Sequence, residues 1–354
     1  MFKSNYSTAN KILHRFAFSS QRAQIVLSDM EDDLYKSKIQ GIEISEPVFI
    51  TGLPRAGTTT LLDLFARSGA FAAHSYRQLP FIHTPMLWSA FSKRLAGDEA
   101  AQERSHGDGI LIDADSKEAL EEMLWLAFWK KRYRGKAIEV WPEQAKPDFD
   151  AYFKQHLRKI IALSAPEHRY VSKNNLNICR LPYLRRLFPD AHLVVPFRQP
   201  LQQATSLLYQ HLNFIDRHKD DKFARDYMAA LGHFDFGDNL KPVDFGGWSG
   251  RNEYQPETIN YWLSYWLHTY GYILATAPKT GALLLAYDEL CANPVAALEK
   301  LSEATRVPAG ASLAQLHNDI RQPKDKHEQR DNCDSQLLLA CETLYQQLLD
   351  KAPL

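Results

Sequence analysis

One short stretch of the sequence combines glycine, arginine and threonine in an order that suits anion binding. The segment Gly52–Thr60 reads GLPRAGTTT. Its glycines allow tight folding, so successive N–H groups and the start of a following helix can point at one anion. The spacing matches the nucleotide-binding pattern GxxxxGKS/T, except that Thr58 replaces the lysine and the cation lies inside the loop, at Arg55. This suits a ligand with one phosphate and one sulfuryl group better than a triphosphate with magnesium, and better than a glycine-rich turn without a ligand.

An arginine and a serine form a second candidate anion site. Arg198 follows the apolar segment 191–197, and Ser206 comes eight residues later, inside a predicted helix. A guanidinium group can bind a phosphate through two hydrogen bonds, and a hydroxyl two turns into the helix can donate to the same phosphate. An arginine at the end of a strand is more often a partner in a surface ion pair. Together with the glycine-rich loop, we favour the phosphate interpretation.

Three segments resemble a known family. Residues 54–59, PRAGTT, resemble the 5′-phosphosulfate loop of sulfotransferases, usually written PRSGTT or PKSGTT. Residues 188–206 are similar to the family's 3′-phosphate segment, although Gln199 replaces the more common aspartate. Residues 286–294, AYDELCANP, resemble its YEDL segment. The similarity extends from about residue 47 to about residue 300, and it is closest to the branch with carbohydrate and protein-tyrosine sulfotransferases.

This resemblance implies an activity and a set of site residues. It implies transfer of a sulfuryl group from the donor co-substrate 3′-phosphoadenosine 5′-phosphosulfate to an acceptor hydroxyl, with a glycan or glycolipid as the acceptor expected by analogy. Lys173, at the end of a predicted strand, is expected to face the reacting sulfuryl group and to act with Arg55 in catalysis. The residues expected to bind the donor are Arg55, Ala56, Gly57, Thr58, Thr59, Thr60, Arg198, Ser206 and Tyr287.

The general base that removes the acceptor proton is harder to assign. Some relatives use a glutamate about twenty residues after the loop, but the stretch 74–78, HSYRQ, has no carboxylate. We therefore place His106 first, because it lies among polar and glycine residues and has a near-neutral reference pKa. Asp108 or Asp113 could orient it, and His83 and Glu122 are the next candidates. A solvated histidine without a catalytic role is the alternative for His106.

Two other functions compete with this assignment. A nucleotide kinase of the phosphate-loop class is disfavoured, because the sequence lacks the loop lysine and a strand that ends in the aspartate expected for magnesium. A non-catalytic nucleotide-binding scaffold of the same fold is the second alternative, because no carboxylate occupies the position where some relatives have their general base. No HExxH motif or tight aspartate and histidine cluster is present, so we predict no catalytic metal.

The order of predicted elements indicates how these residues are positioned. Strands at 47–52, 169–173, 191–197 and 281–287 alternate with helices at 57–68, 117–131, 149–164, 181–187, 201–211 and 258–276. This alternation predicts an α/β, three-layer P-loop-type fold with a central parallel sheet flanked by helices. A glycine-rich loop is expected at 246–250. The aromatic residues at helical spacing within 258–276 are expected to be core, and they are Tyr261, Trp262, Tyr265, Trp266 and Tyr270.

We expect one domain over residues 1–354. It comprises a helical N-terminal extension (1–45), a core (47–300) and a helical C-terminal segment (301–354). In the extension, spaced apolar residues that include Ile25, Leu27, Met30 and Leu34 indicate helical packing outside the main sheet.

Composition excludes several classes of protein. The 42 basic residues balance the 42 acidic residues, which argues against a broad electrostatic surface for nucleic acid or anionic lipid. The four cysteines have no CxxC spacing, as expected for reduced thiols. Residues 1–20 lack the apolar core of a signal peptide, and the longest apolar runs are too short for a membrane span. We therefore expect a cytoplasmic protein with no nucleic-acid partner. The sequence does not indicate whether the protein forms oligomers.

Overall fold

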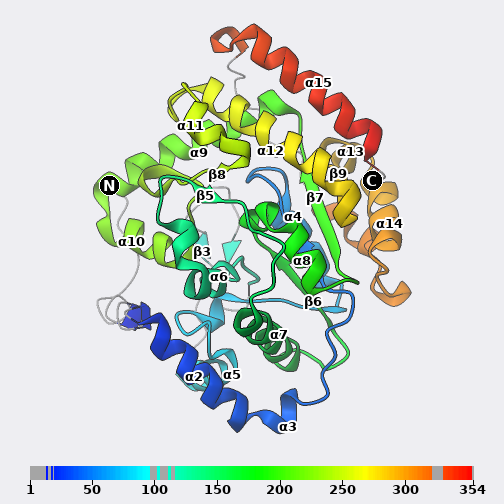
Figure 1. The fold of residues 1–354 in the computed structure, drawn as a ribbon. Coiled ribbons are helices and arrows are strands. Elements are labelled where there is room, and N and C mark those ends of the chain that lie inside the picture. The colour runs from blue at the N-terminus through cyan, green and yellow to red at the C-terminus, as the bar shows by residue number, and fades with distance from the viewer. Residues whose placement is uncertain are drawn as a thin grey trace.

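A five-stranded parallel sheet forms the centre of the molecule (Figure 1). The computed structural model describes residues 13–14, 17–18, 20–95, 102–103, 111–112, 116–320 and 330–352. The strand order is β2-β6-β1-β7-β9, with bounds β1 Val48–Ile50, β2 Phe71–Ala72, β6 Arg169–Lys173, β7 His192–Phe197 and β9 Leu283–Ala286. Ile50 pairs with Lys173 on one side and with Val194 on the other. The carboxyl ends of β1, β6 and β7 therefore meet at one edge of the sheet.

Each face of the sheet has its own hydrophobic core, because alternate residues of a strand point to opposite faces. Val48 and Ile50 pack in a core with α4 (Thr58–Arg67) and α14 (Pro294–Ala304). Phe49 packs in the other core, with α7 (Pro147–Ala162), α8 (Leu181–Leu187) and α12 (Ile259–Thr280). This layering of helices, sheet and helices confirms the predicted fold class.

The described chain has further helices, some of which add to these two cores, and two short strand pairs. The helices are α2 Gln21–Leu34, α3 Lys36–Ile39, α5 Pro85–Leu95, α6 Glu122–Trp129, α9 Pro200–Asp220, α10 Lys222–Leu231, α11 Trp248–Arg251, α13 Tyr287–Ala292 and α15 Ser335–Lys351. The pairs are antiparallel β3 Gln102–Glu103 with β4 Leu111–Ile112, and parallel β5 Ile138–Glu139 with β8 Val243–Asp244. Within the part of the chain described, no helix combines the length and the apolar character that crossing a bilayer requires.

Several element bounds differ from those predicted. The predicted strand 169–173 and helix 181–187 are confirmed residue for residue. Helix α9 continues to Asp220, because residues 212–220 contain neither glycine nor proline to end it. The loop predicted at 246–250 is wrong in part. Gly246 and Gly247 both have positive φ and make a turn, after which the chain re-enters a helix at Trp248.

Helix α2 forms where the apolar spacing indicates a helix, but it packs by its polar side. Leu27, Met30 and Leu34 are 42%, 61% and 66% exposed, whereas the buried residues of the helix are Gln24, Ser28 and Glu31. The buried Lys159 of α7 explains this orientation. Its Nζ lies 3.1 Å from Glu31 Oε2 and donates to Ser28 Oγ at 2.8 Å.

The aromatic residues of α12 are core, as predicted. All five members of the set are buried, and they are Tyr261, Trp262, Tyr265, Trp266 and Tyr270. The hydroxyl of Tyr270 donates to Pro196 O at 3.1 Å, which ties this helix to β7. The helix ends at Gly281, whose φ of 62° places it in the left-handed region that commonly terminates helices.

Candidate active site

The predicted phosphate loop lies between β1 and α4, at the carboxyl edge of the sheet. Thr51 fixes its start, since its N–H donates to Val194 O at 2.9 Å. Helix α4 begins directly after Gly57, so the first N–H groups of the helix have no acceptor within it and are available to an anion. Ala56 and Thr58 are buried, whereas Arg55 remains partly exposed. The loop therefore has the strand, glycine and helix arrangement predicted from the sequence, and its role in anion binding stays a prediction.

Gly57 is required by its conformation and by a close neighbour. Its φ is +86°, and a Cβ atom there would lie 2.0 Å from Cε2 of Tyr287. Tyr287 begins α13 and is buried against the loop, which raises the pKa of its phenol, while its hydrogen bond with Thr60 acts in the opposite direction. The structure therefore brings three of the residues expected to bind the donor into contact.

Arg55 connects the loop to α9. Its Nε donates to Ser206 Oγ at 3.2 Å. Its φ of 70° lies in the left-handed region, which costs a residue with a side chain about 1–2 kcal/mol. Ser206 is buried in the second turn of α9. The two predicted anion sites thus meet at the same edge of the sheet.

Arg198 lies one strand away from the loop, directly after β7. Its Nη2 donates to Gln202 Oε1 at 3.0 Å, and its Nε lies 3.6 Å from Asp288 Oδ1. Asp288 also accepts hydrogen bonds from Gln199 N–H at 2.8 Å and from Tyr345 Oη at 3.0 Å. A carboxylate of the AYDELCANP segment therefore holds both Arg198 and the start of α9.

Lys173 and Asn175 complete this edge from β6. Lys173 ends the strand beside Ile50, as the sequence predicts. Asn175 contacts the loop twice, because its backbone oxygen accepts from Thr51 Oγ1 at 3.1 Å and its Oδ1 accepts from Thr58 Oγ1 at 3.5 Å. Its amide nitrogen donates to Asp235 Oδ2 at 3.2 Å.

Comparison with known proteins identifies the family. The model of the sulfotransferase family matches residues 47–235, just over half of the chain. The chain belongs to the sulfotransferase family. The matched part of this sulfotransferase includes the glycine-rich loop, Lys173, Arg198 and Ser206, and Tyr287 lies beyond it.

Two solved structures share the fold. Sulfotransferase STF9 from Mycobacterium avium is 15% identical, with a TM-score of 0.52 and coverage of 92% of this chain and 81% of that chain. Sulfotransferase STF1 from Mycobacterium tuberculosis H37Rv is 16% identical, with a TM-score of 0.50 and coverage of 95% and 85%. At these identities the likeness bears on the fold alone. No curated protein matches the sequence.

Gln203 supports the loop of this sulfotransferase and was not predicted. Its Nε2 donates to Pro54 O at 3.0 Å and to Leu53 O at 3.3 Å, and its Oε1 accepts from Trp266 Nε1 at 3.0 Å. The side chain is fully buried. Its spacing of three residues from Ser206, which places both on one side of α9, is the signal in the sequence that could have indicated it.

The candidate bases from the sequence are placed as follows. His106, Asp108 and Asp113 lie outside the described residues. His83 is buried, and its Nδ1 lies 2.6 Å from Tyr152 Oη. Burial lowers the pKa of His83 to about 3.

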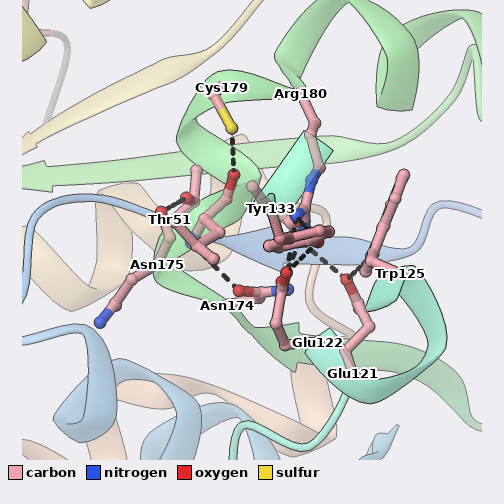
Figure 2. Close-up of polar contacts among 11 residues, drawn as sticks. Thr51, Glu121, Glu122, Trp125, Tyr133, Asn174, Asn175, Cys179 and Arg180 are labelled. Carbon is pink, nitrogen blue, oxygen red and sulfur yellow. Dashed lines mark hydrogen bonds and ion pairs between the residues drawn. The ribbon is translucent and has the colours of Figure 1, made fainter. Parts of the chain in front are cut away.

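Glu122 is the centre of a buried polar network (Figure 2). Its carboxylate accepts from Asn174 Nδ2 at 2.8 Å, from both terminal nitrogens of Arg180 at 2.7 Å, and from the hydroxyl of Tyr133. Figure 2 shows the side chain of Asn174 pointing into this network and that of Asn175 pointing away from it. The network occupies both oxygens of Glu122 and fixes the turn that follows β6.

Metal-ligating side chains do not gather in the described part of the chain. No group of three or more histidine, cysteine, aspartate or glutamate side chains there could hold a metal ion. Three of the residues predicted to bind the donor or to act in catalysis carry a positive charge, and they are Arg55, Lys173 and Arg198.

Proposed function

We propose that this sulfotransferase moves the sulfuryl group of 3′-phosphoadenosine 5′-phosphosulfate to a hydroxyl of a glycan or glycolipid. The hydrogen bond between Arg55 and Ser206 is the observation that supports this most directly. It joins the loop expected to bind the 5′-phosphosulfate to the segment expected to bind the 3′-phosphate. A nucleotide that carries both groups fits this arrangement better than a nucleotide with a single chain of phosphates.

The reaction requires positioning and charge stabilisation. The acceptor oxygen forms a bond to sulfur while the bond from sulfur to the bridging oxygen breaks, and adenosine 3′,5′-bisphosphate leaves. Negative charge grows on that bridging oxygen. Arg55, Lys173 and the N–H groups at the start of α4 are the groups that stabilise this charge.

The competing functions make different predictions for the loop. A kinase needs a lysine that reaches the terminal phosphates, and Thr58 occupies that position with its hydroxyl directed to Asn175. A non-catalytic scaffold needs no reactive cation beside the sulfuryl group, whereas Lys173 lies at the end of the strand next to the loop.

A transfer assay tests the proposal. The purified protein is incubated with donor that is radiolabelled in its sulfuryl group and with pools of cell glycans, lipids and phenols. We expect label in a glycan or glycolipid, and complete loss of transfer in Arg55→Ala. Arg67→Ala is the matched control, because Arg67 lies at the other end of α4 and is about half exposed. Donor binding without any labelled acceptor would instead support the scaffold.

A further inference from the structure

A histidine and an aspartate that the sequence did not indicate share a small cavity with Lys173 and Asn175, at the carboxyl end of β6. They are His233 and Asp235, in the segment that follows α10. Gly232 directs the chain there, because it has a φ of +85° and the N–H of His233 donates to Met228 O at 2.9 Å. A Cβ at Gly232 would lie 2.3 Å from Cγ of Glu122, so only glycine fits at this turn.

Asp235 is connected to the loop through one side chain. Asn175 donates to Asp235 Oδ2 at 3.2 Å and accepts from Thr58 Oγ1 at 3.5 Å. The side-chain amide of Asn175 therefore links the phosphate loop to Asp235. An amide in this position can fix the carboxylate relative to a ligand held by the loop.

A small cavity joins this pair to Lys173. Its volume is about 20 Å³, and its lining includes Lys173, Asn175, His233 and Asp235. That volume suffices for one water molecule or one hydroxyl group. As whole residues His233 and Asp235 are only partly buried, and both line this cavity. A hydroxyl in this cavity would lie between the cation expected at the sulfuryl group and a group able to accept its proton.

The charges around His233 suit proton acceptance. Burial lowers the pKa of His233, and the positive charge of Lys173 acts in the same direction, which favours the neutral imidazole at pH 7. The carboxylates of Glu118, Asp235 and Glu122 act in the opposite direction and stabilise the imidazolium once it forms. Burial also raises the pKa of Asp235, whereas Lys173 and His233 lower it.

We propose that His233, assisted by Asp235, is the general base that removes the proton of the acceptor hydroxyl. As the acceptor oxygen bonds to sulfur, its proton passes to the imidazole, and the electron pair of the broken bond leaves with adenosine 3′,5′-bisphosphate. The imidazolium then releases the proton to solvent. Asn175 acts as a positioning residue. This inference rests on the proposed sulfotransferase activity.

Substitution of His233 tests the inference. The substrate is the acceptor that the transfer assay identifies. His233→Ala and His233→Gln should lower turnover by roughly 10²–10⁴-fold. Binding of adenosine 3′,5′-bisphosphate, measured by calorimetry, should stay within about twofold of wild type, which also reports that the variants are folded. His168→Ala, at a surface turn, is the control and should keep full turnover.

Three outcomes separate the two proposals. Full turnover in both His233 variants would overturn the role of His233 and leave the sulfotransferase activity intact. A wild-type protein that binds the nucleotide but labels no acceptor would overturn the proposed function, and the inference with it. Weak nucleotide binding by both His233 variants would assign His233 to donor binding and overturn its role as the base.

The pH profile distinguishes a base from a structural histidine. The specificity constant kcat/KM should decrease at acidic pH as His233 becomes protonated. Asp235→Asn removes a carboxylate that raises the pKa of His233, so this acidic limb should move to lower pH while maximal turnover decreases. An acidic limb at the wild-type pH in Asp235→Asn would contradict the pairing of the two residues.

Discussion

At the scale of single residues, two glycines with left-handed backbones at the ends of α4 differ in what surrounds them. Gly57, before the helix, has a φ of +86° and packs against Tyr287. Gly69, after it, has a φ of +82° and has no atom within 4 Å of the position that a Cβ would take. Substitutions at the two glycines can therefore distinguish backbone strain, which both would suffer, from a steric clash with Tyr287, which only Gly57 would suffer.

Gly57→Ala should weaken binding of adenosine 3′,5′-bisphosphate at least tenfold, because Tyr287 must move away from the loop and the N–H groups lose their alignment. Gly69→Ala should bind the nucleotide as wild type does. Both variants should lose about 1 kcal/mol or more of folding stability from the positive φ. Calorimetric titration and chemical denaturation measure the two effects, and equal nucleotide binding by the two variants would contradict the assigned role of the Tyr287 contact.

How much of the site can be predicted from the sequence depends on how far apart in the chain the contacting residues are. The sequence indicates Arg55 and Gly57 as candidate donor-binding residues, because the pattern of strand, glycines and helix around them is local. Gln203 and Asn175 were not, because their partners in the loop lie more than 100 residues earlier in the chain. The sequence did not indicate His233 for the same reason, since only the fold brings the end of α10 to the end of β6.

At the scale of elements, α2 and α7 are joined by a buried ion cluster. Lys159 is 1% exposed and Glu31 is fully buried. The Nζ atom of Lys159 lies 2.5 Å from Asp32 Oδ1 and donates to Ser28 O at 3.0 Å. Apolar periodicity predicted the helix, but it cannot predict which face packs when a buried cation on another helix selects the polar face.

Lys159→Met should lower the free energy of unfolding by about 3–5 kcal/mol, because it leaves the buried carboxylate of Glu31 without its cation. Urea denaturation at pH 7 measures this change. Lys219→Met is the control, since Lys219 forms an exposed pair with Asp216, and it should change stability little. A stability close to that of wild type in Lys159→Met would show that the cluster does not hold α2 in place.

At the scale of the whole molecule, three buried histidines lie on or against α7: His156 within the helix, His74 stacked on it, and His83 beside Tyr152. The rings of His74 and His156 stack with their centroids 5.1 Å apart. Burial lowers the pKa of His74 to about 4, that of His83 to about 3, and that of His156 well below its usual value. Neither ring nitrogen of His156 has a hydrogen-bond partner in the described structure.

These histidines should make the fold sensitive to acid. The unfolded chain takes up their protons near pH 6.5, whereas the folded protein does so only near pH 4 or below. Stability should therefore decrease as the pH falls below about 6.5, by roughly 1.4 kcal/mol per pH unit for each histidine. Urea denaturation at pH 7.5 and at pH 5 measures the slope.

His156→Phe is the matched variant for this effect, because phenylalanine keeps a stacked ring and removes one titrating group. Its free energy of unfolding should change less with pH than that of wild type, and the difference should be about the contribution of one histidine. An identical dependence in the variant would contradict the assignment of the acid sensitivity to these rings.

Binding of two nucleotides by wild type and Arg198→Ala tests the central claim, that the loop and Arg198 together hold a nucleotide with a 3′-phosphate. Calorimetry compares adenosine 3′,5′-bisphosphate with adenosine 5′-monophosphate. Charge-assisted hydrogen bonds to Arg198 should make wild type bind the bisphosphate about 10–100-fold more tightly than the monophosphate. Arg198→Ala should lose most of this preference and bind the monophosphate as wild type does. Wild-type affinity for the bisphosphate in Arg198→Ala would contradict the account.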